Sequence, residues 1–240
     1  MFAHKTVSVV VPAYNEENFI SSTLAVIPAF VDDVIVVDDF SRDDTVERVR
    51  QVGDRRIRVV RHTTNQGVGG AILTGYREAL AYGSDVAVVM AGDGQMDPED
   101  LPALLEPIAQ GEADYVKGNR FIHPHTYRCM PRVRLLGNVG LSLLTSVASG
   151  YWNILDSQCG YTAVTAAALR RLAFDAIYPR YGFPNDFLAH LHSAGARVAQ
   201  VRVRPIYDGQ DSGIRPLASV PSLSYVLARS WVHRLARELL

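Results

Sequence analysis

Carboxylate and amide side chains gather directly after one apolar segment of the chain. Beyond the run that ends at Met90 the sequence reads Ala-Gly-Asp-Gly-Gln, so Asp93 lies between two glycines and Gln95 follows it. Oxygen ligands of this kind suit Mg²⁺ or Mn²⁺, and the glycines let a bulky ligand approach the backbone. The alternative is that Asp93 caps the next helix, a role that we predict for Asp97 because it precedes Pro98.

Two further polar stretches follow apolar runs in the same way. Asp38 and Asp39 come after residues 34–37, and the segment Pro-Ala-Tyr-Asn-Glu at residues 12–16 comes after residues 7–11. A carboxylate at a strand end can accept hydrogen bonds from a ribose or a base edge. The alternative for the acidic pair is to cap the helix that begins near Thr45.

Short β-branched runs alternate with helical patterns through the first 120 residues. This alternation predicts the α/β class: a Rossmann-like, mostly parallel sheet with helices on both faces, in a single domain. The predicted strands are residues 7–11, 34–37, 57–61, 86–90 and 115–117, and the predicted helices are 17–27, 45–52, 69–82 and 98–109. Ligands bind beyond the carboxyl ends of parallel strands, so we expect residues 12–16, 38–39 and 91–95 to meet at one edge.

The second half of the chain has a less regular rhythm. Residues 123–131 are predicted as a loop, and we then expect helices at 135–149, near 187–193 and at 222–240, and a strand at 198–203. The 240 residues carry a net charge of -1, which gives no reason to expect nucleic acid as a partner. The two cysteines lack metal-ligand spacing, which is typical of a protein in a reducing cytosol.

A glycine-rich stretch, Asn-Gln-Gly-Val-Gly-Gly at residues 65–70, opens the helix after the third strand. Its spacing and its position both differ from the dinucleotide-binding fingerprint, so it favours close backbone packing or a phosphate contact instead of a NAD site. Guanidinium groups suit a pyrophosphate, and Arg120 and Arg215 are the candidates for that role. A single arginine is more often a solvated surface charge.

Four motifs occur in order: Pro-Ala-Tyr-Asn-Glu at 12–16, Val-Asp-Asp-x-Ser-x-Asp at 37–43, Asn-x-Gly-x-Gly at 65–69 and Gly-Asp-Gly-Gln at 92–95. With them the chain resembles the family-2 glycosyltransferases, and within these it is most similar to the dolichol- and polyprenyl-phosphate sugar (mannose) synthases. The resemblance implies a GT-A fold, a nucleotide-sugar donor such as GDP-mannose or a UDP-sugar, a Mg²⁺ or Mn²⁺ ion and inversion at the anomeric carbon.

The resemblance also implies roles for particular residues. Asp93 falls on the second acid of the family's metal motif with Gln95 beside it, and Arg120 falls on a phosphate-binding arginine. The candidates for nucleotide-sugar binding are Pro12, Ala13, Tyr14, Glu16, Val37, Asp38, Asp39, Gly92, Arg120 and Arg215. Residues 1–218 would form the GT-A catalytic domain, with a nucleotide-binding half at 1–120 and an acceptor-side half at 121–218. Residues 219–240 would form a C-terminal helix.

The chain departs from the family pattern at three points. Ala91 stands where the family commonly has the first acid of its metal motif, so the diphosphate of the donor would have to supply more metal ligands. Gln210 stands where the family often has an arginine, and Arg215 is the candidate to replace its charge. The synthases often carry transmembrane helices after the catalytic domain, and the sequence shows none.

The sequence does not decide whether the acceptor is a lipid phosphate or a hydroxyl group. A polyprenyl phosphate is already an anion, so its attack needs no strong base, whereas a saccharide or other hydroxyl acceptor needs a carboxylate to take its proton. Asp186 is the candidate for that base, and its alternative role is to cap the helix near Phe187. The catalytic candidates are therefore Asp93, Arg120 and Asp186. A sugar nucleotidylyltransferase and a non-catalytic subunit that has lost metal binding are the remaining alternatives.

Two segments bear on membrane contact. Residues 135–155 carry no charge but contain many polar residues, so we expect a buried or half-buried helix there. In the C-terminal helix Leu223, Leu227, Trp231 and Leu235 recur every four residues among arginines, a pattern typical of a helix in the lipid headgroup plane or packed on the domain or a partner. We therefore expect a cytoplasmic protein that is peripheral on the cytoplasmic face of a membrane.

Overall fold

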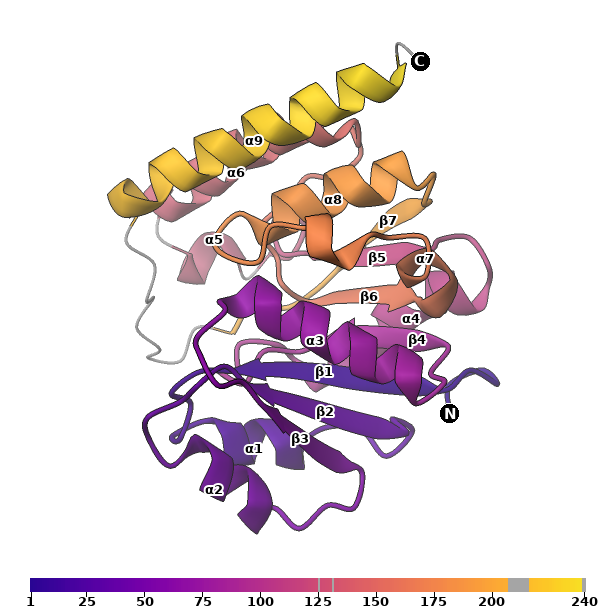
Figure 1. Ribbon diagram of the computed structural model, residues 1–240, viewed down its shortest axis with the longest axis vertical. Coiled ribbons are helices and arrows are strands. Elements are labelled where there is room, and N and C mark those ends of the chain that lie inside the picture. Colours follow the sequence, from indigo (N-terminus) through magenta and orange to yellow (C-terminus); the bar gives the residue numbers. More distant parts are fainter. Residues whose placement is uncertain (125, 131, 207–215, 239–240) are drawn as a thin grey trace.

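The computed structural model describes residues 1–124, 126–130, 132–206 and 216–238. Across these residues the chain forms one sheet of seven strands in the order β3-β2-β1-β4-β6-β5-β7 (Figure 1). The strands are β1 (Val7–Ala13), β2 (Asp33–Asp38), β3 (Ile57–Arg61), β4 (Val86–Val89), β5 (Tyr115–Asn119), β6 (Thr162–Thr165) and β7 (Val198–Arg202). All neighbouring strands pair in parallel except β6, which is antiparallel to both β4 and β5.

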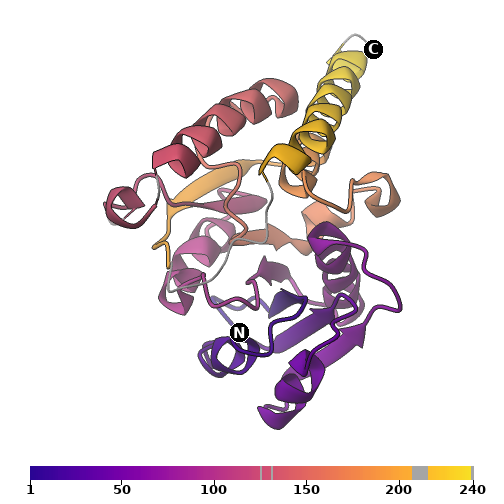
Figure 2. The ribbon, with the colours of Figure 1, turned by 90° about the vertical axis from the view of Figure 1, so that its left-hand side faces the viewer.

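Helices cover both faces of this sheet. The helices are α1 (Ile20–Ala25), α2 (Thr45–Gln51), α3 (Val68–Ala81), α4 (Leu101–Ala109), α5 (Thr126–Cys129), α6 (Arg132–Ser149), α7 (Ala166–Leu169), α8 (Phe183–Ser193) and α9 (Pro216–Glu238). Helices α1, α2 and α4 pack on one face, and α3, α7 and α8 pack on the other. Helices α6 and α9 contact α8 and each other, and form a further layer at the end of the molecule remote from α1 and α2 (Figures 1 and 2).

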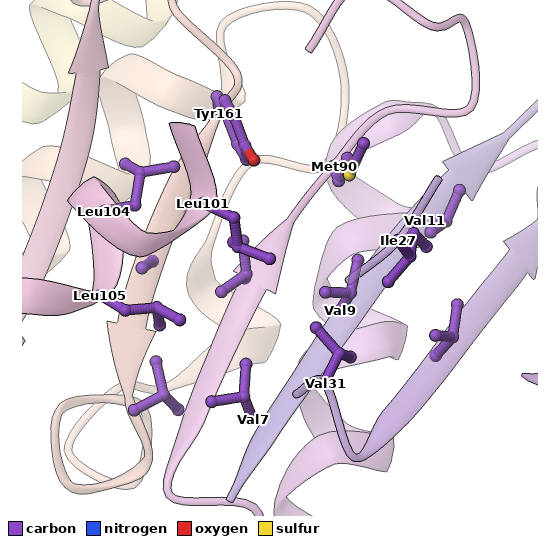
Figure 3. Packing of buried hydrophobic residues seen from close by; sticks show 14 of the residues in the cluster. Val7, Val9, Val11, Ile27, Val31, Met90, Leu101, Leu104, Leu105 and Tyr161 are labelled. Atoms are coloured by element: carbon purple, nitrogen blue, oxygen red, sulfur yellow. The ribbon is translucent and has the colours of Figure 1, made fainter. Parts of the chain in front are cut away.

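The core follows from the alternation of side chains along the central strands. Val7, Val9 and Val11 of β1 point to the face on which Leu101 and Leu104 of α4 pack (Figure 3). Val10, between them, points to the opposite face, toward α3 and α8. Because helices cover both faces, every residue of β1 is buried, which explains why its sequence is apolar apart from Ser8.

The predicted class is confirmed: this is a single-domain α/β fold with a mostly parallel sheet. The six predicted strands form, and the ends of β1, β2 and β4 lie at one edge as expected. Strand β6 was not predicted. None of the described helices is long and apolar enough to cross a membrane.

Some predicted element boundaries were wrong. The helix expected near 187–193 begins at Phe183, because Gly182 turns the chain with φ 113° and Pro184 fits the first helical turn. The helix expected at 17–27 is shorter, and the loop expected at 123–131 contains α5. The C-terminal helix, expected from residue 219, begins at Pro216 and contacts α6 and α8.

Candidate active site

The loops that follow β1 and β2 are tied to each other by hydrogen bonds. The backbone N–H of Asn15 donates to Ser41 Oγ at 2.9 Å, and the N–H of Glu16 donates to Thr45 Oγ1 at 2.8 Å. Both loops contain a non-glycine residue with a left-handed backbone, Asn15 at φ 57° and Phe40 at φ 70°. Such conformations persist only where the surroundings enforce them, so this edge of the sheet is held in a defined shape.

Asp38 and Asp39 at the end of β2 are buried and serve as internal braces. Asp38 accepts hydrogen bonds from Ser41 N at 3.2 Å and from Arg61 Nε at 3.0 Å. Asp39 accepts from the N–H groups of Gln66 and Gly67, both at 2.8 Å. Neither carboxylate caps the helix at Thr45, so that alternative was wrong; Asp43 accepts the Thr45 N–H instead.

A buried histidine completes the environment of Asp39. His62 Nδ1 lies 2.8 Å from Asp39 Oδ1, and His62 Nε2 lies 3.0 Å from Thr74 Oγ1 of α3. Asp39 therefore links β2, β3 and the loop that opens α3. Through this link the strand-end carboxylate fixes the glycine-rich stretch at residues 65–70.

Asp93 lies in a tight turn beyond β4, where Gly94 has φ 72°. Its Oδ1 accepts the N–H of Gln95 at 3.0 Å. Asp97, not Asp93, caps the following turn by accepting the N–H of Glu99 at 3.0 Å, as predicted for Asp97. Burial raises the pKa of Asp93, although its hydrogen bond from Gln95 partly offsets the shift.

Glu16 is the acidic neighbour of Asp93. Burial, followed by the negative charges of Asp93 and Asp43, raises the pKa of Glu16 to about 7. The described residues contain no group of three or more His, Cys, Asp or Glu side chains arranged to hold a metal ion. Asp93 and Gln95 nevertheless fit a divalent cation, because they offer hard oxygen atoms beside a second carboxylate. A diphosphate would have to supply further ligands.

Arg120, at the end of β5, is held by a buried carboxylate that the sequence reasoning did not single out. Arg120 Nε and Nη2 form hydrogen bonds to Asp156 Oδ2 and Oδ1 at 2.8 and 2.9 Å, and its backbone N–H also contacts Asp156 Oδ2. Asp156 is fully buried. A forked pair of this kind fixes the plane of the guanidinium.

A cavity of about 360 Å³ brings several of these groups together. Asp93, Gln95 and Arg120 line it, together with Arg180 and Arg204. Much of the remaining wall is apolar and comes from α3, from the loop after β4, from the start of α8 and from the segment after β7: Val68, Ile72, Met96, Phe183, Pro184, Val203 and Ile206. The cavity therefore combines a carboxylate, three guanidinium groups and an apolar wall.

The glycines of the 65–70 stretch allow the segment that precedes α8 to approach α3 closely. The N–H of Gly70 donates to Pro179 O at 2.9 Å, and a Cβ atom on Gly69 would lie 2.6 Å from that oxygen. Arg180 Nη2 then donates to Asn65 O at 3.1 Å. The prediction of close backbone packing is confirmed, and it positions Arg180 at the cavity.

Asp186 lies elsewhere. Its side chain is buried inside α8, where it accepts hydrogen bonds from Tyr178 N at 2.8 Å and from Ser230 Oγ of α9 at 3.2 Å. Burial alone would raise its pKa, but hydrogen bonds from His190 and Tyr178 and the charge of Arg229 lower it overall. Asp186 is not among the described residues that line the cavity. The capping alternative for it was wrong, because α8 begins at Phe183.

The other candidates lie at the same edge of the sheet as the cavity or outside the described residues. Pro12 and Ala13 pair with Val37 and Asp38 in register, all four are buried, and Tyr14 beyond them is 44% exposed. Gly92 N donates to Pro12 O at 3.3 Å, which joins the β4 loop to β1. Arg215 lies outside the described residues.

Comparison with known proteins identifies the family. Residues 8–177 match the family model described as Glycosyl transferase family 2. The chain belongs to this family. Among curated relatives, this glycosyltransferase is 30% identical over 220 residues to the UDP-N-acetylglucosamine--dolichyl-phosphate N-acetylglucosaminyltransferase of Methanococcus voltae, covering 85% of this chain and 87% of the relative. It is 35% identical over 199 residues to the undecaprenyl-phosphate mannosyltransferase of Micrococcus luteus, covering 81% of each.

A solved structure gives the same result for the fold. This glycosyltransferase matches glucosyl-3-phosphoglycerate synthase from Mycobacterium tuberculosis, crystallised with Mn²⁺, UDP and phosphoglyceric acid. The TM-score is 0.69 at 25% identity, over 97% of this chain and 79% of the synthase. The GT-A fold expected from the sequence motifs is therefore confirmed.

Proposed function

We propose that this glycosyltransferase moves a hexose from a nucleotide sugar to a polyprenyl phosphate, with inversion at the anomeric carbon. The observation that carries the proposal is the cavity, which is lined by Asp93 and Gln95, by Arg120, Arg180 and Arg204, and by a largely apolar wall. Carboxylate and amide oxygens suit a cation bound to a diphosphate, guanidinium groups suit phosphates, and an apolar wall suits an isoprenoid chain.

On the donor side, the loop at residues 12–16 and the end of β2 would hold the nucleoside. Asp39 would contribute to nucleoside binding by fixing the backbone of Gln66 and Gly67, in addition to any direct contact between Asp39 and the nucleoside. Asp93 and Gln95 would hold Mg²⁺ or Mn²⁺ together with oxygens of the donor. When bound, the cation offsets the charge that develops on the departing nucleoside diphosphate.

On the acceptor side, the arginines of the cavity would hold the anionic phosphate near the anomeric carbon. Arg120 is oriented by Asp156, and Arg180 is oriented by its contact with the 65–70 stretch. A phosphate oxygen is already negatively charged, so its attack needs positioning and charge balance but no general base. The buried, hydrogen-bonded state of Asp186 is consistent with this chemistry.

A hydroxyl acceptor is the second candidate. It is favoured by the structural similarity to glucosyl-3-phosphoglycerate synthase, whose crystals contain phosphoglyceric acid. In that case Asp186 would be the base, and it would have to leave its contacts with Tyr178 and Ser230 to reach the cavity. The names of the Methanococcus and Micrococcus relatives favour the lipid phosphate.

The first experiment is a transfer assay. Purified protein with Mn²⁺ or Mg²⁺ is incubated with a polyprenyl phosphate and a panel of labelled UDP- and GDP-sugars, and label is measured after partition into organic solvent. We expect extractable label from one donor, and the anomeric configuration of the product, read by NMR, tests inversion. Asp93→Asn should abolish transfer without changing thermal unfolding.

Three results would count against the proposal. Transfer by Asp93→Asn at the wild-type rate would remove Asp93 from the reaction. Release of nucleoside diphosphate with all label left in water would replace the lipid acceptor by a hydroxyl acceptor. Failure of Mn²⁺ and Mg²⁺ to tighten the binding of any nucleoside diphosphate, together with no release, would indicate a non-catalytic subunit.

A further inference from the structure

The segment of residues 156–161, which leads into β6, is held in place from several sides. The backbone N–H of Ser157 donates to Ser142 Oγ of α6 at 3.0 Å, and the Nζ of Lys117 in β5 donates to Cys159 O. All four of these residues are buried. Residues 158–161 line the cavity, so these anchors fix the backbone of one part of its wall.

Gln158 is the half-buried side chain of this segment, and its amide group has a fixed orientation. Its Nε2 donates to Ser157 Oγ and to Asn185 Oδ1 of α8, both at 2.9 Å. Asn185 is buried, and its Oδ1 also accepts the hydroxyl of Thr145 in α6 at 2.9 Å. A side-chain amide has two N–H hydrogens, and both of those of Gln158 therefore have acceptors inside the protein.

The carbonyl oxygen of the same amide remains for a ligand. None of the described residues donates a hydrogen bond to Gln158 Oε1. Asn138 adds a second amide to the cavity wall, and its side chain forms no hydrogen bond with the described residues. Asn138 lies four residues before Ser142 and thus on the same side of α6, the side that contacts the 156–161 segment.

We propose that Gln158, together with Asn138, forms the subsite that recognises a hydroxyl group of the transferred hexose. The inference rests on the proposed function, because it takes the sugar of the donor as the ligand. A carbonyl oxygen only accepts hydrogen bonds, so Gln158 Oε1 repels phosphate oxygens and finds no donor on an isoprenoid chain. The nucleoside would be held at residues 12–16 and the end of β2, which leaves the hexose as the source of an O–H donor.

The position of Gln158 in the chain fits this assignment. Asp156, two residues earlier, holds the guanidinium of Arg120 at the cavity. One short segment therefore orients a phosphate-binding arginine and also presents an acceptor for a hydroxyl. A hexose attached to a diphosphate needs these two kinds of group close to each other.

Deoxy sugars test the subsite. Purified protein with Mn²⁺ is assayed with UDP-glucose, UDP-N-acetylglucosamine and GDP-mannose, and the donor that is transferred, or failing transfer binds most tightly, is compared with its monodeoxy analogues. We expect one analogue to lose about 10- to 100-fold in kcat/KM, because Gln158 Oε1 is left without its donor. In Gln158→Met the parent donor should lose the same factor, and that analogue should show no further loss.

Gln200→Met is the matched control. Gln200 is half-buried in β7, its Oε1 accepts hydrogen bonds from Asn119 Nδ2 and Leu155 N at 3.1 and 2.8 Å, and it is not among the described residues that line the cavity. Loss of these contacts lowers stability, but the ratio of parent to deoxy activity should keep its wild-type value. An equal change of that ratio in both methionine variants would overturn the subsite, because a general loosening would then explain it.

A binding measurement separates the subsite from the proposed function. The dissociation constants of the donor and its analogues are measured with Mn²⁺ by calorimetry in the absence of an acceptor. If no sugar reaches polyprenyl phosphate but binding still shows the discrimination that depends on Gln158, the subsite stands and the lipid acceptor falls. If transfer to polyprenyl phosphate proceeds and Gln158→Met keeps the wild-type ratio for every analogue, the subsite falls alone. Equal acceptance of every deoxy analogue by the wild type would also overturn it, even if Gln158→Met fails to fold.

Discussion

Under the proposed function, the guanidinium of Arg120 has to be held facing the cavity, and its hydrogen bonds to Asp156 supply that restraint. Because the pair is buried, Asp156→Asn should reduce the free energy of unfolding by up to about 3–5 kcal/mol. In the protein that remains folded it should lower kcat/KM about 10- to 100-fold through loss of orientation. Thermal unfolding and the partition assay measure the two effects.

A second arginine–aspartate pair provides the control for Asp156→Asn. Arg197 Nε lies 3.2 Å from Asp114 Oδ2 on the surface, and neither residue lines the cavity. Asp114→Asn should leave kcat/KM unchanged. If Asp156→Asn is folded and as active as Asp114→Asn, the orientation of Arg120 does not limit the reaction.

Asp39 has a structural role that can be separated from ligand binding. Because it accepts N–H groups from Gln66 and Gly67 in a buried place, Asp39→Asn should lower the free energy of unfolding by about 1–3 kcal/mol without any nucleotide present. Under the proposed function, the affinity for the nucleoside diphosphate of the donor, measured by calorimetry, should fall as well because the 65–70 stretch is loosened. A variant with weaker nucleotide binding but unchanged denaturant unfolding would show that Asp39 only contacts the ligand.

Residue types at the ends of strands were informative because parallel strands bring those ends to one edge whatever the loops do. That rule placed Asp38, Asp39 and Asp93 near one another from sequence alone. It could not show that Asp39 is used as a brace, nor that Asp156 restrains Arg120, since both depend on partners more than 20 residues away. The sequence around Asp156 reads Asp-Ser-Gln-Cys-Gly-Tyr, and nothing in it indicates that Arg120 is the partner.

At the scale of elements, local patterns predicted six of the strands and missed β6. Strand β6, Thr162–Thr165, runs antiparallel between β4 and β5, outside the alternation of strands and helices that predicted the parallel strands. It is specified mainly by the neighbours that flank it, which local propensity does not register. The start of α8 was also mispredicted. Gly182 turns the chain and Pro184 fits the first helical turn, so the two residues together set the start of the helix at Phe183.

Strand β5 contains a fully buried lysine that gives the fold a measurable pH dependence. Burial lowers the pKa of Lys117 from 10.5 to about 8, although the nearby Asp156 acts in the opposite direction. Its Nζ donates a hydrogen bond to Cys159 O. The unfolded lysine keeps its proton up to about pH 10.5, so between pH 8 and pH 10.5 the unfolded chain binds more protons, and stability rises with pH in this window.

The test compares wild type with Lys117→Met. Methionine is a long apolar side chain that fills a similar space but has no group that titrates. The wild type should gain stability relative to the variant as pH rises from 8 to 10, by at most about 1.4 kcal/mol per pH unit. Urea unfolding at several pH values measures the difference directly. Parallel pH profiles would mean that Lys117 does not release its proton in the folded state.

At the scale of the whole molecule, the single α/β domain and its two-sided coverage were predictable from the alternation of strands and helices. The layer formed by α6 and α9 was not. The absence of charge predicts a buried or half-buried helix, and one side of α6 is indeed buried. The buried side, however, is the side that carries the serine and threonine hydroxyls. Only the packing reveals which side faces outward.

The contact between α3 and the segment that precedes α8 gives the last prediction. A methyl group on Gly69 would meet Pro179 O at 2.6 Å and Phe183 Cβ at 2.7 Å. Gly69→Ala should therefore cost about 1–3 kcal/mol of stability through overpacking, although alanine favours helices. Arg180, next to Pro179, should be displaced with the loop, so the KM for the acceptor should rise.

Gly137 is the matched control, because it also lies in a helix but has open space where its Cβ would be. Gly137→Ala should be neutral or stabilising by up to about 1 kcal/mol, with an unchanged KM for a short soluble acceptor. Thermal unfolding and acceptor titrations of both variants complete the comparison. Equal behaviour of the two alanine variants would mean that the segment before α8 can move away from α3 without consequence, and the cavity would then not depend on the contact between Gly69 and Pro179.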